Sequence, residues 1–148
     1  MTLPADATIL AFDFGTRRIG VAVGNTMLRI ARPLLTLELK SNSADAIDAI
    51  APLVEEWSPA LLVVGLPVHA DGTAHDMTAK ARRFAQRLEI AFARPVRLVD
   101  ERYTTAAAAS ELDAREAGRA GRFVRDQLAA QLILQAYFDS PDDSNPAP

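Results

Sequence analysis

The 148-residue chain has no cysteine, only one tryptophan and no long apolar run. The absence of cysteine excludes a disulfide scaffold and fits a reducing compartment. No apolar run approaches the roughly 20 residues that a membrane-spanning helix needs. The first residues also lack the basic stretch and long apolar stretch of a secretory signal. These absences predict a cytoplasmic protein with no membrane partner.

Several well-known functional motifs are also missing. There is no G-x-x-x-x-G-K-[ST] loop, no G-x-G-x-x-G, no H-E-x-x-H and no G-x-S-x-G. This argues against a P-loop enzyme, a dinucleotide-binding domain, a zinc protease and a serine hydrolase. The only histidines, His69 and His75, flank a turn, where solvated polar residues are expected more often than metal ligands.

The charge balance leaves nucleic-acid binding open. The net charge is −3 and the sequence pI is about 5.3, whereas nucleic-acid-binding domains often exceed pI ~9. Only Lys40 and Lys80 are lysines, so fourteen of the sixteen cations are arginines. The planar guanidinium suits phosphate, although genomic base composition can produce the same excess of arginine.

Apolar periodicity and turn residues divide the chain into alternating elements. Strands are expected at 9–14 and 20–24, within 28–39, and at 61–65 and 96–99. Helices are expected at 43–57, 76–92, about 104–117 and 125–138. Pro33 predicts an edge strand or a bulge, and Pro52 predicts a kinked or split helix. A flexible basic linker is expected at 118–122.

A strand hairpin followed by alternating strands and helices predicts an α/β fold with a mixed sheet covered by helices. One domain is expected over residues 1–138. The tail, 139–148, contains too few apolar residues to fold and is expected to be disordered.

Four acidic residues lie where predicted strands and helices begin or end: Asp13, Asp100, Glu101 and Asp126. Sites in α/β sheets gather outside the carboxyl ends of the strands, so Asp13 and Glu101 should meet at one edge. Asp126, at the start of the last predicted helix, can fold over that edge. Each acid taken alone could instead cap a turn, stabilise a loop or pair with a neighbouring arginine.

Carboxylates that converge repel one another unless a cation lies between them. Hard oxygen ligands without cysteine favour Mg²⁺ or Mn²⁺ over zinc. Two such ions would balance four carboxylates and would suit in-line phosphodiester hydrolysis. The cations expected to contact phosphate are Arg17, Arg18, Lys80, Arg83, Arg102, Arg119, Arg122 and Arg125.

Five segments together resemble the YqgF/RuvX family: FDFGTRRIGVAVGN (12–25), VVGLPVHADGT (63–73), ARRFAQRL (81–88), VDERYTT (99–105) and DQLAAQLILQAYF (126–138). The resemblance runs from about Ile9 to Phe138. It implies an RNase H-like five-stranded sheet of order 3-2-1-4-5, with the second strand antiparallel. It also implies that Asp13, Glu101 and Asp126 are the catalytic metal ligands, which leaves Asp100 without an assigned role.

The same resemblance implies a nuclease that matures the 5′ end of 16S pre-rRNA or resolves Holliday junctions. The expected partners are therefore RNA such as pre-16S rRNA, branched DNA and ribosomal particles. Two alternatives stay open at this point. One is a non-catalytic factor that binds nucleic acid or the ribosome. The other is an ATP-binding module of the sugar kinase/actin type, which the short chain disfavours because those proteins close two such lobes on a nucleotide.

Overall fold

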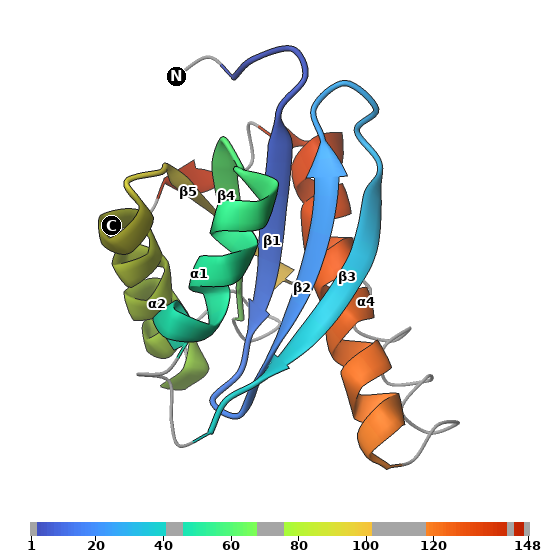
Figure 1. The fold of residues 1–148 in the computed structure, drawn as a ribbon, viewed down its shortest axis with the longest axis vertical. Coiled ribbons are helices and arrows are strands. Elements are labelled where there is room, and N and C mark those ends of the chain that lie inside the picture. Colours follow the sequence, from blue (N-terminus) through green and yellow to red (C-terminus); the bar gives the residue numbers. More distant parts are fainter. Residues whose placement is uncertain (1–2, 41–45, 68–75, 102–117, 142–143, 147–148) are drawn as a thin grey trace.

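The structure is a computed structural model that describes residues 3–40, 46–67, 76–101, 118–141 and 144–146 (Figure 1). The helix expected over about 104–117, both histidines and Arg102 lie outside these ranges, as does the side chain of Arg119. No helix within the described ranges is both long and apolar enough to cross a membrane.

Six strands and three helices are described. The strands are β1 (Thr8–Phe14), β2 (Arg18–Asn25), β3 (Ala31–Glu38), β4 (Leu61–Leu66), β5 (Val96–Asp100) and β6 (Asn145–Pro146). The helices are α1 (Ala46–Trp57), α2 (Asp76–Phe92) and α4 (Arg119–Asp139).

The strands form one mixed sheet in the order β3-β2-β1-β4-β5-β6. β2 is antiparallel to both β1 and β3, whereas β1, β4 and β5 are parallel. The expected order 3-2-1-4-5 and the antiparallel second strand are therefore confirmed. A sixth short strand, β6, pairs with β5 and comes from the tail for which we expected no fixed structure.

Pro33 lies where its chemistry predicts. β3 is an edge strand, and its register with β2 shifts between Val21 and Ala22, so that Ala22 faces Pro33. Proline has no N–H to donate to a sheet, which confines it to edges and bulges.

Two apolar cores lie on opposite faces of the sheet. One packs α1 and α2 against side chains such as Leu10 and Phe12 of β1. The other packs α4 against the alternate positions Ile9 and Ala11. Because successive side chains of a strand point to opposite faces, odd-numbered residues of β1 face α4 and even-numbered ones face α1 and α2.

Pro52 does not split its helix, contrary to one expectation. α1 is continuous from Ala46 to Trp57 with Pro52 inside it. Proline lacks the N–H that would bond the carbonyl four residues earlier. The neighbouring side chains Ile50, Leu53 and Val54 are buried in the core, and this packing offsets the lost hydrogen bond.

The last helix begins earlier than expected. α4 starts at Arg119 rather than at Arg125, so the segment expected to be a flexible linker forms the first turns of the helix. Glycine inside a helix costs about 1 kcal/mol, but tertiary contacts hold this part in place. The Thr36 hydroxyl of β3 donates a 2.7 Å hydrogen bond to the carbonyl of Phe123. Asp126 is consequently an internal residue of α4 rather than its opening residue.

Candidate active site

Strand alternation places two of the predicted acids on the same face of the sheet. Asp13 shares the orientation of Ile9 and Ala11 on β1, which face α4. Glu101 directly follows β5, two residues after Val99, which also faces α4. Because β1 and β5 run parallel, both acids lie at the carboxyl edge of the sheet. Asp100 takes the opposite orientation, with Val96 and Leu98.

The third acid comes from α4, and a glycine lets it come close. A Cβ atom added to Gly20 would lie 1.9 Å from the carbonyl oxygen of Asp126. Gly20 is paired with Asp13 in the β1–β2 ladder. The bare backbone of Gly20 therefore allows α4 to bring Asp126 beside Asp13.

A second glycine has the same effect beside Glu101. A Cβ atom added to Gly65 of β4 would lie 2.3 Å from Cδ1 of Ile133 and 3.1 Å from the carboxyl carbon of Glu101. Gly65 thus leaves room for α4 and for the Glu101 side chain at the same edge.

The electrostatics agree with this convergence. Burial raises the pKa of Asp13 well above its usual range, and the charges of Glu101 and Asp126 raise it further, whereas Arg125 lowers it. Burial also raises the pKa of Glu101 to about 7, and Asp100 adds to that shift. Ionisation of Asp13 and Glu101 therefore places negative charge in a buried site beside other acids, and a bound cation would offset this cost.

An arginine already neutralises one of the three acids. Nε of Arg18 donates a 2.7 Å hydrogen bond to Oδ2 of Asp126, and both side chains are largely shielded from solvent. Asp13, Arg18 and Asp126 line a cavity of about 220 Å³ with the β1–β2 turn.

Within the described ranges, no group of three acidic or histidine side chains is arranged to hold a metal ion. The structure thus brings Asp13, Glu101 and Asp126 into electrostatic contact without completing a three-carboxylate metal site. On the side of Asp126, one carboxylate oxygen is occupied by Arg18.

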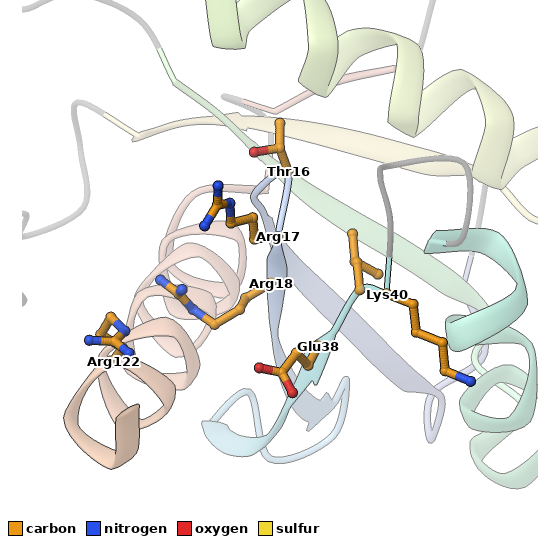
Figure 2. Close-up of a pocket in the computed structure, with 7 residues that line it drawn as sticks. Thr16, Arg17, Arg18, Glu38, Lys40 and Arg122 are labelled. Carbon is orange, nitrogen blue, oxygen red and sulfur yellow. The ribbon is translucent and has the colours of Figure 1, made fainter. Parts of the chain in front are cut away.

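A larger cationic cavity opens next to the acids. It has a volume of about 720 Å³ and is lined by Thr16, Arg17, Arg18, Glu38, Leu39, Lys40 and Arg122. Figure 2 shows the side chains of Arg17, Arg18 and Arg122 on the α4 side of the cavity, whereas Lys40 extends away from them. The two cavities share Thr16, Arg17 and Arg18, so the cationic cavity adjoins the cavity that contains Asp13 and Asp126.

Three cations of α2, among them the predicted Lys80 and Arg83, lie on the other face of the sheet. Lys80, Arg83 and Arg87 line a small hollow beside Phe14, and the Phe14 ring stacks on Phe84 with centroids 4.5 Å apart. Phe14 follows Asp13 in the chain. Positive side chains therefore flank the acids on both faces of the sheet.

The structure adds one cation to which the sequence had assigned no role. Lys40 follows β3, and β3 runs parallel to β1 because both are antiparallel to β2. Both strands consequently end at the same edge. The pairing pattern of three hairpin strands was the signal that would have placed Lys40 at the same edge of the sheet as Asp13.

Comparison with known proteins identifies the family. The model of the RuvX family, described as "Holliday junction resolvase", matches residues 7–140. A Nitrosospira multiformis protein named "Putative pre-16S rRNA nuclease" is 56% identical over 137 residues, which cover 92% of this chain and 90% of that protein. A Nitrosomonas europaea protein of the same name is 55% identical over 142 residues and 94% of each chain.

A solved structure shares the fold at low identity. RuvC of T. thermophilus, in complex with a Holliday junction substrate, aligns with a TM-score of 0.58 and 16% identity, covering 95% of this chain and 99% of that one. The family match spans almost the whole chain, and the two relatives align with 92% and 94% of it. The chain therefore belongs to the RuvX family of Holliday junction resolvases.

Proposed function

We propose that this protein is a metal-dependent nuclease that hydrolyses phosphodiester bonds in pre-16S rRNA during its maturation. The observation that carries the proposal is the approach of Asp126 and Glu101 to Asp13 at one edge of the sheet, where burial and then the charges of these two acids raise the pKa of Asp13. The names of the close relatives support RNA as the substrate.

The acids fit a divalent cation by the chemistry of their donors. Carboxylate oxygens are the ligands that Mg²⁺ and Mn²⁺ prefer, and the excess negative charge around Asp13 would be relieved by such an ion. Asp13 and Glu101 would hold the cation from the sheet, and Asp126 would complete the site from α4. When bound, the metal would activate water and stabilise the leaving oxygen, and two ions would serve both roles together.

The surrounding cations would position the substrate. Arg17 and Arg122 line the cationic cavity next to the acids, and Lys80 and Arg83 lie beside Phe14 on the other face of the sheet. Contacts with backbone phosphates fix a strand in place without reading its sequence. Such contacts would draw the phosphodiester backbone across Asp13 from one face of the sheet to the other.

A cleavage assay tests this function. Purified protein is incubated with Mn²⁺ or Mg²⁺ and either a pre-16S rRNA fragment with its 5′ extension or a four-way DNA junction. We expect a shortened rRNA product that disappears with EDTA. Cleavage of the junction alone would make branched DNA the substrate.

The control is Asp13→Asn, which keeps the shape of the side chain and removes its charge. We expect it to fold and to lose at least about 100-fold in rate, because a catalytic metal contributes several kcal/mol of transition-state stabilisation. Undiminished cleavage by this variant would refute the role of Asp13. RNA binding without cleavage under either metal would support the non-catalytic binding factor instead.

A further inference from the structure

Arg18 is the cation that pairs with Asp126, the third of the predicted metal ligands. Its Nε is 2.7 Å from Oδ2 of Asp126, and 24% of its side chain is exposed, against 12% for Asp126. A charge-assisted hydrogen bond at this distance is a strong one. The guanidinium of Arg18 therefore neutralises the charge of the Asp126 carboxylate without any bound ion.

Arg18 also lines both cavities. On one side is the cavity with Asp13 and Asp126, and on the other is the cationic cavity with Arg122. The guanidinium carries five N–H donors, and it matches phosphate geometry as well as it matches carboxylate. A phosphate that enters the cationic cavity therefore competes with Asp126 for Arg18.

The ion pair and a metal ion at Asp126 oppose each other. A dication and a guanidinium on the same carboxylate repel, so each lowers the occupancy of the other. A phosphate that attracts Arg18 removes this repulsion and frees Asp126. Such coupling between two ligands is reciprocal by thermodynamic necessity.

We propose that Arg18 is a positioning residue that couples the binding of metal to the binding of nucleic acid. The Arg18 side chain pairs with Asp126 until a nucleic-acid phosphate binds in the cationic cavity and attracts the guanidinium. Asp126 is then free to complete the metal site. This inference rests on the proposed function and adds a regulation of the same site. It explains why the acids converge while no metal-ready group of three is found within the described ranges.

The neighbouring Arg17 provides a matched control. It directly precedes Arg18 in the chain, lines the same two cavities and carries the same charge, but it forms no ion pair with any described residue. Arg17→Gln therefore removes an equal charge from the same place without releasing Asp126.

The experiment measures Mn²⁺ affinity by calorimetry, with and without a fully phosphorothioate oligonucleotide that stays intact during the titration. For the wild-type protein we expect the oligonucleotide to tighten Mn²⁺ binding at least about fivefold, as is typical of coupled sites. For Arg18→Gln we expect tight Mn²⁺ binding already without the oligonucleotide, and little further gain when it is added. Arg17→Gln should bind the oligonucleotide more weakly, because Arg17 lines the cationic cavity, but at a saturating oligonucleotide concentration it should retain the wild-type coupling.

The outcomes separate this inference from the proposed function. Wild-type Mn²⁺ binding that the oligonucleotide does not change would overturn the coupling, and so would equal gains in Arg18→Gln and Arg17→Gln. If circular dichroism shows that Arg18→Gln does not fold, the wild-type titration and a titration of Arg18→Lys still decide the question. Without the oligonucleotide, we expect Arg18→Lys to bind Mn²⁺ with an affinity between those expected for the wild-type protein and for Arg18→Gln. A wild-type protein that cleaves RNA without coupling would refute only this inference, whereas one that binds no Mn²⁺ would refute the proposed function.

Discussion

Gly20 lies directly against the backbone of Asp126. A Cβ atom at Gly20 would meet the Asp126 carbonyl oxygen at 1.9 Å, far inside van der Waals contact. Backbone oxygens cannot rotate away as a flexible side chain can. The absence of a side chain on β2 therefore sets the distance between α4 and the sheet, and with it the position of the third acid.

We expect Gly20→Ala to move α4 away from β2. Overpacking of this kind typically costs about 1–3 kcal/mol of stability, and here it should also reduce cleavage by displacing Asp126. Urea unfolding and rate measurements test this. Gly24→Ala is the control, because its Cβ would meet the Phe138 ring at 2.6 Å. It should lose stability while the remaining folded protein cleaves normally, and equal loss of rate in both variants would contradict the assignment.

The raised pKa of Glu101 predicts opposite pH trends for stability and for metal binding. In the metal-free protein the unfolded chain ionises near pH 4.5 but folded Glu101 only near 7. Stability should therefore fall as pH rises through that window, by on the order of 2–3 kcal/mol from Glu101. Thermal melts from pH 4.5 to 8 measure this trend. Glu101→Gln should make it shallower, and the raised pKa of Asp13 should supply the part that remains.

Mn²⁺ affinity should rise over the same window, because a carboxylate must be deprotonated to bind a metal. Calorimetry at pH 5.5, 6.5 and 7.5 would show the increase. An affinity that stays constant over this range would mean that Glu101 does not bind the ion.

The cations of α2 should contribute to nucleic-acid affinity through counterion release. The double variant Lys80→Gln/Arg83→Gln should weaken RNA binding. It should also make the negative slope of log affinity against log salt shallower, by about 0.7 for each lost contact with a single strand. Filter binding from 50 to 300 mM salt measures the slope. Arg82→Gln is the control, because Arg82 is exposed on the same helix but does not line the hollow beside Phe14. An equal loss of affinity for each charge removed in the control would show that only net charge matters.

Local patterns in the sequence were sufficient for the elements and their order. Apolar runs marked β1, β4 and β5, and helical periodicity marked both ends of α2. Pro33 correctly indicated the edge and the bulge of β3. These signals are local, because a strand or an amphipathic helix repeats its pattern within a few residues.

The start of α4 and the environment of Asp126 depended on contacts between distant residues. Glycines at 118 and 121 indicated a linker, yet the hydrogen bond from Thr36 and the close packing on Gly20 hold this segment as helix. The ion pair with Arg18 joins residues 108 positions apart, which no local pattern encodes.

The sequence by itself determined that this chain folds as a mixed α/β sheet with acids at its strand ends, because hydrophobic periodicity and turn chemistry act over short stretches. Only the tertiary structure decided that Asp13 and Glu101 face α4 while Asp100 does not, and that Arg18 forms an ion pair with Asp126. Side-chain orientation follows from strand register and helix packing, and these are fixed when residues far apart in the chain come into contact.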